Sequence, residues 1–280
     1  MKKVLIALIL VLTLFLVACA PTPTPTPPPA ADDAADNGDE VPPEGDGQRP
    51  VIVMGTNAGF EPFEFIADYG QGRHGEFSGI DVAIAVRIAE HIGADLEIYD
   101  TEFASLIMEL QTGRIDFIAA AMTIRPDRQE MANFSDPYFT ATQYIIVPID
   151  NDSVSSVQDL DGLIVGVQLG TTGDIFVTEN VEAESVARYN RVTEAVLDLM
   201  GGSIDAVVVD SAVAQLVVAR YSDRLSIVRD DQAFAQEFYG IAVHLDNLEL
   251  LEQINEVIRE MTEAGEIEAL FVYYAAYLAD

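Results

Sequence analysis

Short apolar runs alternate with amphipathic stretches along residues 51–264. The runs at 51–55, 95–99 and 115–120 have the length and pattern of strands, whereas 81–91 and 102–111 carry apolar residues at helical spacing. Asp81 is expected to be the N-cap of the first helix, and Gly113 to close the second. Strands and helices in this order predict an α/β fold with helices covering sheets.

One unit of this pattern occurs twice. Residues 106–116 and 195–205 each predict a helix, a glycine stop and an Ile-Asp pair, and an apolar strand follows each of them. The first strand leads to Thr123 and Arg128, and the second ends at Asp210. Ligands of open α/β sheets bind beyond the carboxyl ends of strands. We therefore expect two lobes of similar build whose strand ends face one cleft.

Two further apolar runs, 143–148 and 239–243, are expected to connect the lobes. A strongly periodic helix at 248–264 then returns the chain to the first lobe. These features predict lobe 1 at 51–142 plus 241–280, and lobe 2 at 143–240 with the hinge strands. Paired connecting strands would let the lobes hinge.

The N-terminal 50 residues predict a signal peptide followed by a tether. Lys2 and Lys3 precede an apolar run at 4–17, which is short for a bilayer span and suits a signal peptide. The ending Leu16-Val17-Ala18-Cys19 resembles a bacterial lipobox, in which Cys19 becomes the lipidated first residue. An ordinary secretory signal with an incidental cysteine is the alternative. Residues 20–50 are rich in proline and acids, and predict a disordered tether.

Composition excludes several classes of function. The 280 residues carry a net charge of −33, with 47 acidic against 14 basic side chains, which argues against nucleic-acid binding. One cysteine and three histidines allow neither an internal disulfide nor a Cys/His zinc site, so no metal or other cofactor is expected. Residues 70–75 fit GxGxxG, but a hairpin loop is favoured there over a dinucleotide site.

Five blocks of 51–280 together resemble a known family. The blocks at 55–65, 79–82, 121–128, 133–138 and 166–173 are similar to the amino-acid-binding bacterial extracellular solute-binding proteins, family 3 of the ABC importers. The resemblance implies two similar α/β lobes joined by two hinge strands, the periplasmic-binding-protein-like type II fold, with a ligand cleft between the lobes. It also implies a monomeric, lipid-anchored receptor on the extracytoplasmic face of the cell membrane. Such a receptor delivers a free L-amino acid to permease and ATPase subunits.

The resemblance assigns the ligand's carboxylate to residues from both lobes. Arg128 would grip the α-carboxylate, because a guanidinium fork matches it with two parallel hydrogen bonds. Thr123 would add its hydroxyl and N–H groups. Thr171 and Thr172 lie in a glycine-flanked turn, 170–173, whose free N–H groups at a helix start would form a second carboxylate cradle.

The resemblance assigns the ligand's α-ammonium group and side chain to different residues. Asp210 would bind the α-ammonium as a salt bridge, shared with the carbonyl of Ala121. Phe60 and Phe103 would sandwich the ligand's side chain, although both could instead be plain core residues. Because Arg128 and Asp210 belong to different lobes, only a closed cleft satisfies both ends of a zwitterion, which couples closure to binding.

The charged residues also have plain structural alternatives. Arg128 could pair with Asp127 or Glu130 at the surface. Asp210 could serve only to cap a helix at 211–220.

Specificity and an enzymatic alternative depend on four more side chains. Asn57 stands where several relatives selective for basic amino acids have an aspartate, which weakens the case for lysine or arginine and favours a polar amino acid. Gln168 could line the side-chain pocket or point to solvent. Glu61 and Glu64 could still offer a carboxylate to the ligand. They could also act as general acid or base if the chain were a cyclohexadienyl or arogenate dehydratase on the same fold.

Overall fold

The computed structural model describes residues 49–67 and 77–279. The predicted signal peptide, Cys19, the tether as far as residue 48 and the glycine motif at 70–75 lie outside the described residues. Everything described falls within one unit of the chain, 36–280.

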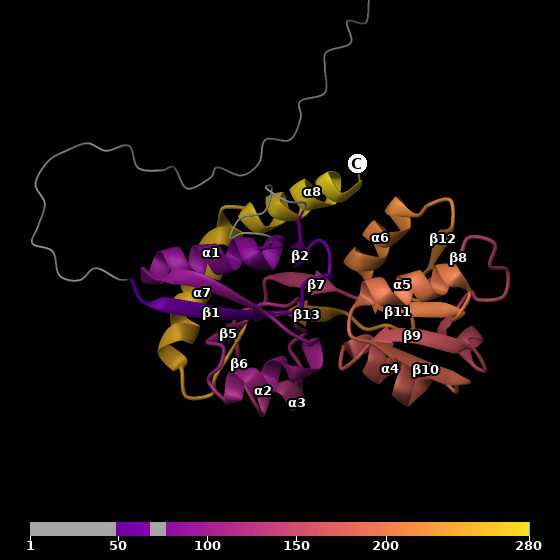
Figure 1. The fold of residues 1–280 in the computed structure, drawn as a ribbon, viewed down its shortest axis with the longest axis horizontal. Coiled ribbons are helices and arrows are strands. Elements are labelled where there is room, and N and C mark those ends of the chain that lie inside the picture. The colour runs from indigo at the N-terminus through magenta and orange to yellow at the C-terminus, as the bar shows by residue number, and fades with distance from the viewer. Residues whose placement is uncertain (1–48, 68–76, 280) are drawn as a thin grey trace, which may run out of the picture. The chain divides into compact units, whose positions relative to one another are not determined.

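Lobe 1 is built on a sheet of order β4-β1-β5-β14-β6. The strands are β1 (Val51–Thr56), β4 (Asp95–Asp100), β5 (Phe117–Ile118), β6 (Asn133–Phe134) and β14 (Ala242–Val243). β1 pairs in parallel with β4 and β5, whereas β14 is antiparallel to both of its neighbours. Helices α1 (Ile80–Ile92) and α7 (Leu248–Glu263) pack together at this sheet, and α2 (Leu106–Gln111) contacts β1 and β5 (Figure 1).

Lobe 2 repeats this plan on a sheet of order β10-β9-β11-β8-β12. The strands are β8 (Gln143–Pro148), β9 (Ile164–Gln168), β10 (Ser185–Tyr189), β11 (Ala206–Asp210) and β12 (Leu225–Val228). Three strands are again parallel, and β8 again runs against its neighbours. The helices are α4 (Thr172–Asn180), α5 (Val192–Gly201) and α6 (Ser211–Arg220), with a short 3-10 turn η2 at Val157–Leu160. The predicted α/β fold of two similar lobes is confirmed.

The repeated Ile-Asp pair has the same structural role in each lobe. The Oδ2 atom of Asp116 accepts a hydrogen bond from the N–H of Val53 in β1, at 2.7 Å. In lobe 2, Oδ2 of Asp205 accepts from the N–H of Ile164 in β9, at 2.8 Å. Each aspartate therefore ties the start of one parallel strand to its neighbour, which explains why the pair recurs.

The first helix begins differently from the prediction. Asp81 was expected to be its N-cap, but the N-cap is Gly79 and no side chain caps the helix. The N–H groups of Ile80 and Asp81 donate to the carbonyls of Pro62 and Phe63, at 3.1 and 2.9 Å, so the helix start is satisfied by backbone. The carboxylate of Asp81 is therefore free to act elsewhere, in the buried interior.

Two other elements are shorter than predicted. Residues 102–111 form a 3-10 turn, η1 (Phe103–Ser105), followed by α2, and Gly113 follows in the left-handed conformation with φ 72°. The strand predicted at 115–120 is limited to β5. The chain beyond β5 leaves the ladder, and α3 (Pro126–Gln129) follows.

The first apolar run expected to connect the lobes, 143–148, lies inside the sheet of lobe 2 as β8. The second, 239–243, starts at the end of strand β13 (Glu237–Tyr239) and finishes as β14 in the sheet of lobe 1. β13 pairs with β7 (Phe139–Ala141) in a two-stranded antiparallel ribbon, and each of these strands lies along the chain between one sheet and the other. Apolar runs buried on both faces belong in sheet cores, whereas the ribbon carries the exposed Thr140 and the 43% exposed Phe238. The lobe boundaries at 142/143 and 240/241 stay a prediction.

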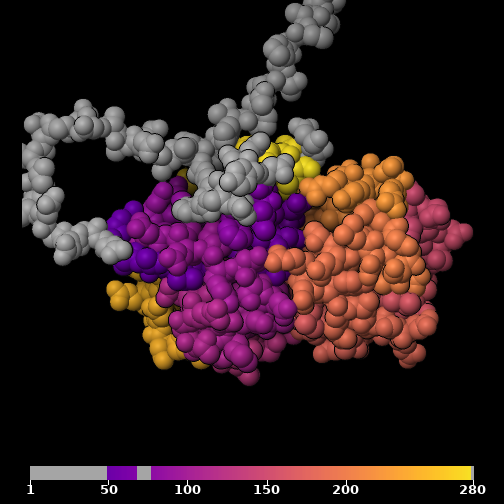
Figure 2. Space-filling view, in the orientation of Figure 1, coloured from indigo at the N-terminus to yellow at the C-terminus, as the bar shows by residue number. Residues whose placement is uncertain are grey.

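Side chains of the two lobes also meet outside the ribbon. The guanidinium of Arg191 pairs with Asp100 at 2.8 Å, and that of Arg220 pairs with Glu61 at 2.6 Å. Figure 2 shows lobe 1, in indigo to magenta, against lobe 2, in orange, on the face in view. Helix α8 (Glu266–Ala279) contacts α1, α7 and also α6 of lobe 2. Within 49–67 and 77–279, no helix is both long and apolar enough to cross a bilayer.

Candidate functional site: a cavity between the lobes

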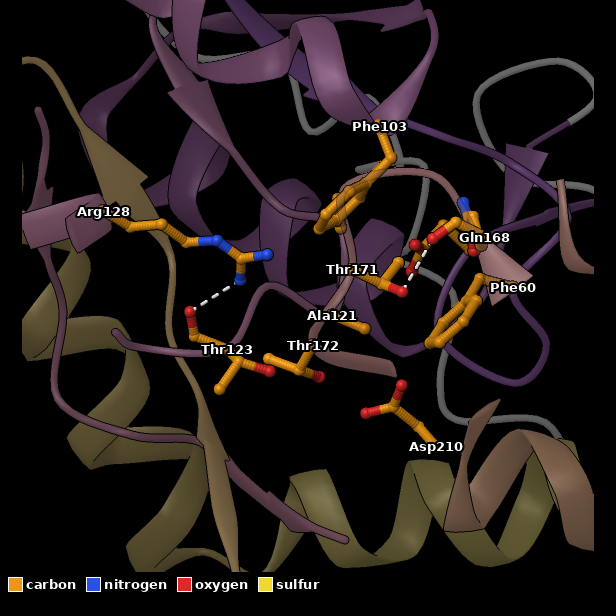
Figure 3. A pocket seen from close by; sticks show the side chains of 11 residues that line it. Phe60, Phe103, Ala121, Thr123, Arg128, Gln168, Thr171, Thr172 and Asp210 are labelled. Atoms are coloured by element: carbon orange, nitrogen blue, oxygen red, sulfur yellow. Dashed lines mark hydrogen bonds between the residues drawn. The ribbon is translucent and has the colours of Figure 1, made fainter. Parts of the chain in front are cut away.

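Residues of both lobes line one small cavity (Figure 3). The lining comprises Phe60, Glu64, Phe103, Ala120, Ala121, Thr123, Arg128, Gln168, Thr171, Thr172 and Asp210. Every predicted site residue within the described chain except Asn57 is among them. The enclosed space is about 10 Å³, roughly what one water molecule requires. An amino acid therefore enters only if the lobes or the lining side chains move.

The lining residues follow the carboxyl ends of parallel strands. Phe60 follows β1, Ala121 and Thr123 follow β5, Gln168 ends β9, and Asp210 ends β11. This is where ligands of open α/β sheets bind. The sequence-based expectation that strand ends from both lobes share one cleft is therefore met by the geometry.

Arg128 is held at one side of the cavity, 5% exposed. Its two terminal nitrogens donate to the carbonyls of Thr123, at 2.8 Å, and Gly170, at 3.0 Å. Its guanidinium carbon lies 5.3 Å from the centre of the Phe103 ring. Burial, and then the charge of nearby Arg125, lower the pKa of Arg128 to about 10. Arg128 is therefore not a surface residue that pairs with Asp127 or Glu130.

Asp210 stands opposite Arg128, and the two are the charged groups labelled at opposite sides in Figure 3. It is 5% exposed, and its Oδ1 accepts from the hydroxyl of Tyr239 at 2.5 Å. Burial, and then the charge of Glu237, raise the pKa of Asp210 to about 7. Asp210 occupies the N-cap position of α6, but its side chain makes no capping hydrogen bond. The carboxylate is therefore directed to the cavity and not to the helix.

The Ala121 backbone is held in an unusual conformation by Asp81. Ala121 has φ 46°, the only positive φ among the described residues other than glycine. Its N–H donates to Oδ2 of Asp81 at 2.7 Å, and the hydroxyl of Tyr138 donates to both oxygens of that carboxylate, at 2.8 and 2.9 Å. No hydrogen bond within the described chain uses the carbonyl oxygen of Ala121. That oxygen is available to a ligand donor.

A carboxylate that the sequence analysis missed, Glu237, lies between the two threonines. Its Oε2 accepts from the hydroxyls of Thr123, at 3.0 Å, and Thr172, at 2.8 Å. Thr123 was expected to donate its hydroxyl to the ligand, and here it donates to Glu237. The available signal was an acidic residue two positions before the predicted connecting run at 239–243.

The turn at 170–173 also differs in part from expectation. Thr171 is the N-cap of α4, and its hydroxyl oxygen accepts from the N–H of Asp174 at 3.3 Å. The N–H of Gly170 donates to Oδ2 of Asp174 at 3.0 Å. The first N–H groups of a helix have no intrahelical partner, so those of Thr172 and Gly173 are left to a ligand. The cradle is narrower than predicted because Asp174 occupies part of it.

Two of the residues that line the cavity, Gln168 and Glu64, carry buried polar atoms without partners. Gln168 donates to Oδ1 of Asn57 at 2.8 Å, while its own Oε1 atom has no hydrogen bond in the described structure. Glu64 is 1% exposed, and its Oε2 is likewise unpartnered. Burial, followed by the charges of Asp81 and Asp210, raises the pKa of Glu64 well above its usual value. Glu61, paired with Arg220, does not line the cavity.

No cluster of metal-binding side chains occurs in the part of the chain that the structure describes. The cavity offers a guanidinium and backbone N–H groups on one side, and carboxyl and carbonyl oxygens on the other. That arrangement can hold a small molecule with one anionic and one cationic end.

Known proteins with similar sequences bind amino acids. The chain is 30% identical over 224 residues to the L-cystine-binding protein TcyJ of Escherichia coli K12, covering 80% of this chain and 82% of that protein. It is 31% identical over 226 residues to the arginine-binding extracellular protein ArtP of Bacillus subtilis 168, covering 78% and 84%.

Solved structures agree with this relationship. A mutant of ArgBP from T. maritima matches with a TM-score of 0.74 and 40% identity, covering 81% of this chain and 95% of that one. An ancestral arginine-binding protein bound to arginine matches with a TM-score of 0.74 and 37% identity, covering 81% and 99%. A family model matches residues 52–276. The chain belongs to the bacterial extracellular solute-binding proteins, family 3.

Proposed function

We propose that the protein is a lipid-anchored extracytoplasmic receptor that binds a free L-amino acid between its lobes and delivers it to an ABC importer. The observation that carries this proposal is the pair Arg128 and Asp210, which come from different lobes and line the same cavity. A guanidinium and a carboxylate on opposite sides match the two ends of a zwitterion. The family relationship supports transport over other uses of such a cavity.

The α-carboxylate is assigned to Arg128 and to the N–H groups of Thr123 and Thr172. The α-ammonium is assigned to Asp210 and the Ala121 carbonyl. Both assignments need the two lobes at once, so the ligand stabilises the closed arrangement by its contacts to the second lobe.

The ligand's side chain is assigned to the part of the cavity with Phe60, Gln168 and Glu64. Unpartnered oxygens on Glu64 and Gln168 favour a side chain with several hydrogen-bond donors. A cationic side chain would also lower the raised pKa of Glu64 and pair with the carboxylate. Arginine-binding proteins among the relatives support the same class. Asn57 argued against a basic ligand, but Glu64 in the cavity lining offers the carboxylate that is absent at position 57. We therefore propose a polar amino acid with a donor-rich side chain, with arginine as the first candidate.

A second function is a dehydratase on the same fold. The observation in its favour is that two cavity carboxyls, Glu64 and Asp210, both have raised pKa values, as general acids often do. The relatives are solute-binding proteins and not enzymes, which favours the receptor.

The deciding experiment is a thermal-shift screen of the twenty amino acids, followed by titration calorimetry of those that stabilise the protein. Stoichiometric binding of L-arginine, lost in Arg128→Ala without a change in fold, is the expected result. The same preparation is assayed for turnover of prephenate and arogenate. Turnover of either one, or an Arg128→Ala variant that binds as tightly as the parent, rejects the receptor.

The remaining assignments concern the cell surface. We propose anchoring through acyl groups, palmitate included, on Cys19, a tether at 20–50, and lobes at 51–142 plus 241–280 and at 143–240. The partners proposed are the permease and ATPase subunits of an importer, which a monomeric receptor approaches from the extracytoplasmic side.

A further inference from the structure

We propose that Glu237 sets the direction of the threonine hydroxyls in the cavity, so that they face the ligand as acceptors and select for its α-ammonium group. This inference rests on the proposed function, because it assigns a role within the same amino-acid site. Glu237 is a positioning residue in this scheme, since it acts through Thr123 and Thr172.

Three donors converge on one oxygen of Glu237. Besides the two threonine hydroxyls, Nε2 of Gln143 lies 3.3 Å from Oε2. Thr123 belongs to the segment after β5, Thr172 begins α4, and Glu237 begins β13 of the connecting ribbon. The carboxylate therefore joins side chains of both lobes from the strand that connects them.

A hydroxyl has one proton, and an ionised carboxylate can only accept. The protons of Thr123 and Thr172 are consequently both directed to Glu237 and away from the ligand. Thr172 also accepts from Nε2 of Gln143 at 3.1 Å, which uses one of its lone pairs. The oxygen of Thr123 accepts no hydrogen bond within the described chain, so its lone pairs are open to the cavity.

The two ends of the cavity thus become opposite in character. Acceptors collect near Asp210, namely its own carboxylate, the Ala121 carbonyl and the Thr123 hydroxyl oxygen. Donors remain on Arg128 and on the backbone N–H groups of Thr123, Thr172 and Gly173. A ligand carboxylate placed among the acceptors would be buried without donors, which is costly, so only an ammonium group fits that end.

Substitution by leucine tests this polarity. Glutamine would not, because its amide oxygen could take the place of Oε2 and accept from both hydroxyls. Glu237→Leu offers neither hydroxyl an acceptor, so the threonine protons are no longer directed away from the ligand. We expect affinity for L-arginine to fall by about tenfold or more, because one ammonium acceptor is lost. Affinity for 5-guanidinopentanoate, which lacks the ammonium, should change by less than about threefold.

Titration calorimetry of both ligands separates the possible roles. If the variant loses affinity equally for both ligands, Glu237 is a merely structural residue. If the variant binds both ligands more tightly, Glu237 competes with the ligand's carboxylate. Either result overturns the proposal. Glu263→Leu, at an exposed glutamate on α7, is the control and should bind as the parent does. If the thermal-shift screen selects L-glutamine, the two ligands compared are L-glutamine and glutaramate, which lacks the ammonium.

A double-mutant cycle with the amino acid alone gives a second measurement. In a Thr123→Val background, which lacks the hydroxyl, Glu237→Leu should cost less than about threefold in affinity. A tenfold cost in that background means that Glu237 does not act through Thr123. Glu237→Asp, which keeps the charge on a shorter side chain, replaces the leucine variant if the latter does not fold. A parent protein that binds none of the twenty amino acids rejects the proposed function itself, whereas normal parental binding with indifferent variants rejects only this inference.

Discussion

The buried carboxyl of Asp81 makes the stability of the protein depend on pH in an unusual direction. Asp81 is fully buried, and burial raises its pKa from 3.8 to about 7 despite the hydrogen bonds from Ala121 and Tyr138. Between pH 4 and 7 the folded state therefore holds a proton that the unfolded state has released. Stability falls as pH rises wherever the folded state binds more protons, and the loss is complete above pH 7.

The perturbation that isolates this group is Asp81→Asn, which resembles the protonated carboxyl in size and cannot ionise. One proton held only by the folded state changes the free energy of unfolding by about 1.4 kcal/mol per pH unit, and this slope falls by half at the folded pKa, about 7. The parent should therefore lose about 2 kcal/mol relative to Asp81→Asn between pH 5 and pH 7. The charge of Asp81 also raises the pKa of Glu64, so its removal weakens a second dependence of the same sign.

Urea unfolding of the ligand-free protein, followed by circular dichroism at half-unit steps from pH 5 to pH 8, measures the difference. The exposed Asp150→Asn is the control, and its curve should run parallel to that of the parent. Parent and Asp81→Asn curves that are parallel across this range would refute the argument, because they would mean that Asp81 ionises alike in both states.

Three further predictions concern the ligand, the helix start and the anchor. Asp210→Asn should weaken amino-acid binding by about 2 kcal/mol or more in calorimetry, and a loss below tenfold counts against the ammonium assignment. Gly79→Ala should cost about 3 kcal/mol or more in urea unfolding, because its Cβ would lie 2.1 Å from the carbonyl oxygen of Phe63 at φ 128°. Gly93→Ala, with φ 72° and open space around it, should cost only about 1 kcal/mol, and similar losses for both contradict the steric reason. Cys19→Ser should move the protein from the membrane to the soluble fraction on cell fractionation, and continued attachment rejects lipidation.

The periodic parts of the fold could be predicted because their signals are local. Strand β1 and helix α7 follow apolar patterns that need no information about neighbours. The repeated Ile-Asp pair revealed the two similar lobes, since Asp116 and Asp205 each tie adjacent parallel strands together. The predicted length of an element was wrong where contacts with neighbouring segments decide it. Residues 115–120 were expected to form a strand, but only two of them, β5, pair in the sheet.

The candidate site also contains residues that the sequence could predict and residues that it could not. Arg128 and Asp210 could be found from sequence because each stands just beyond a recognisable strand or motif, and the family resemblance placed both in one cleft. Asp81 was assigned to the wrong role, since its N–H and its carboxylate meet partners that are distant along the chain, Phe63 and Ala121. Glu237 was missed because nothing near it in sequence indicates that hydroxyls from two lobes converge there.

The sequence by itself determined the α/β lobes, their internal repeat and the identity of the two charged side chains. Periodicity, glycine stops and charged residues at strand ends are properties of short segments, so no tertiary contact is needed to recognise them. Only the tertiary structure decided which hydrogen-bond donors and acceptors remain for a ligand. The reason is that every buried polar group takes a partner wherever folding brings one within about 3 Å, and those partners come from segments that lie far apart in the chain.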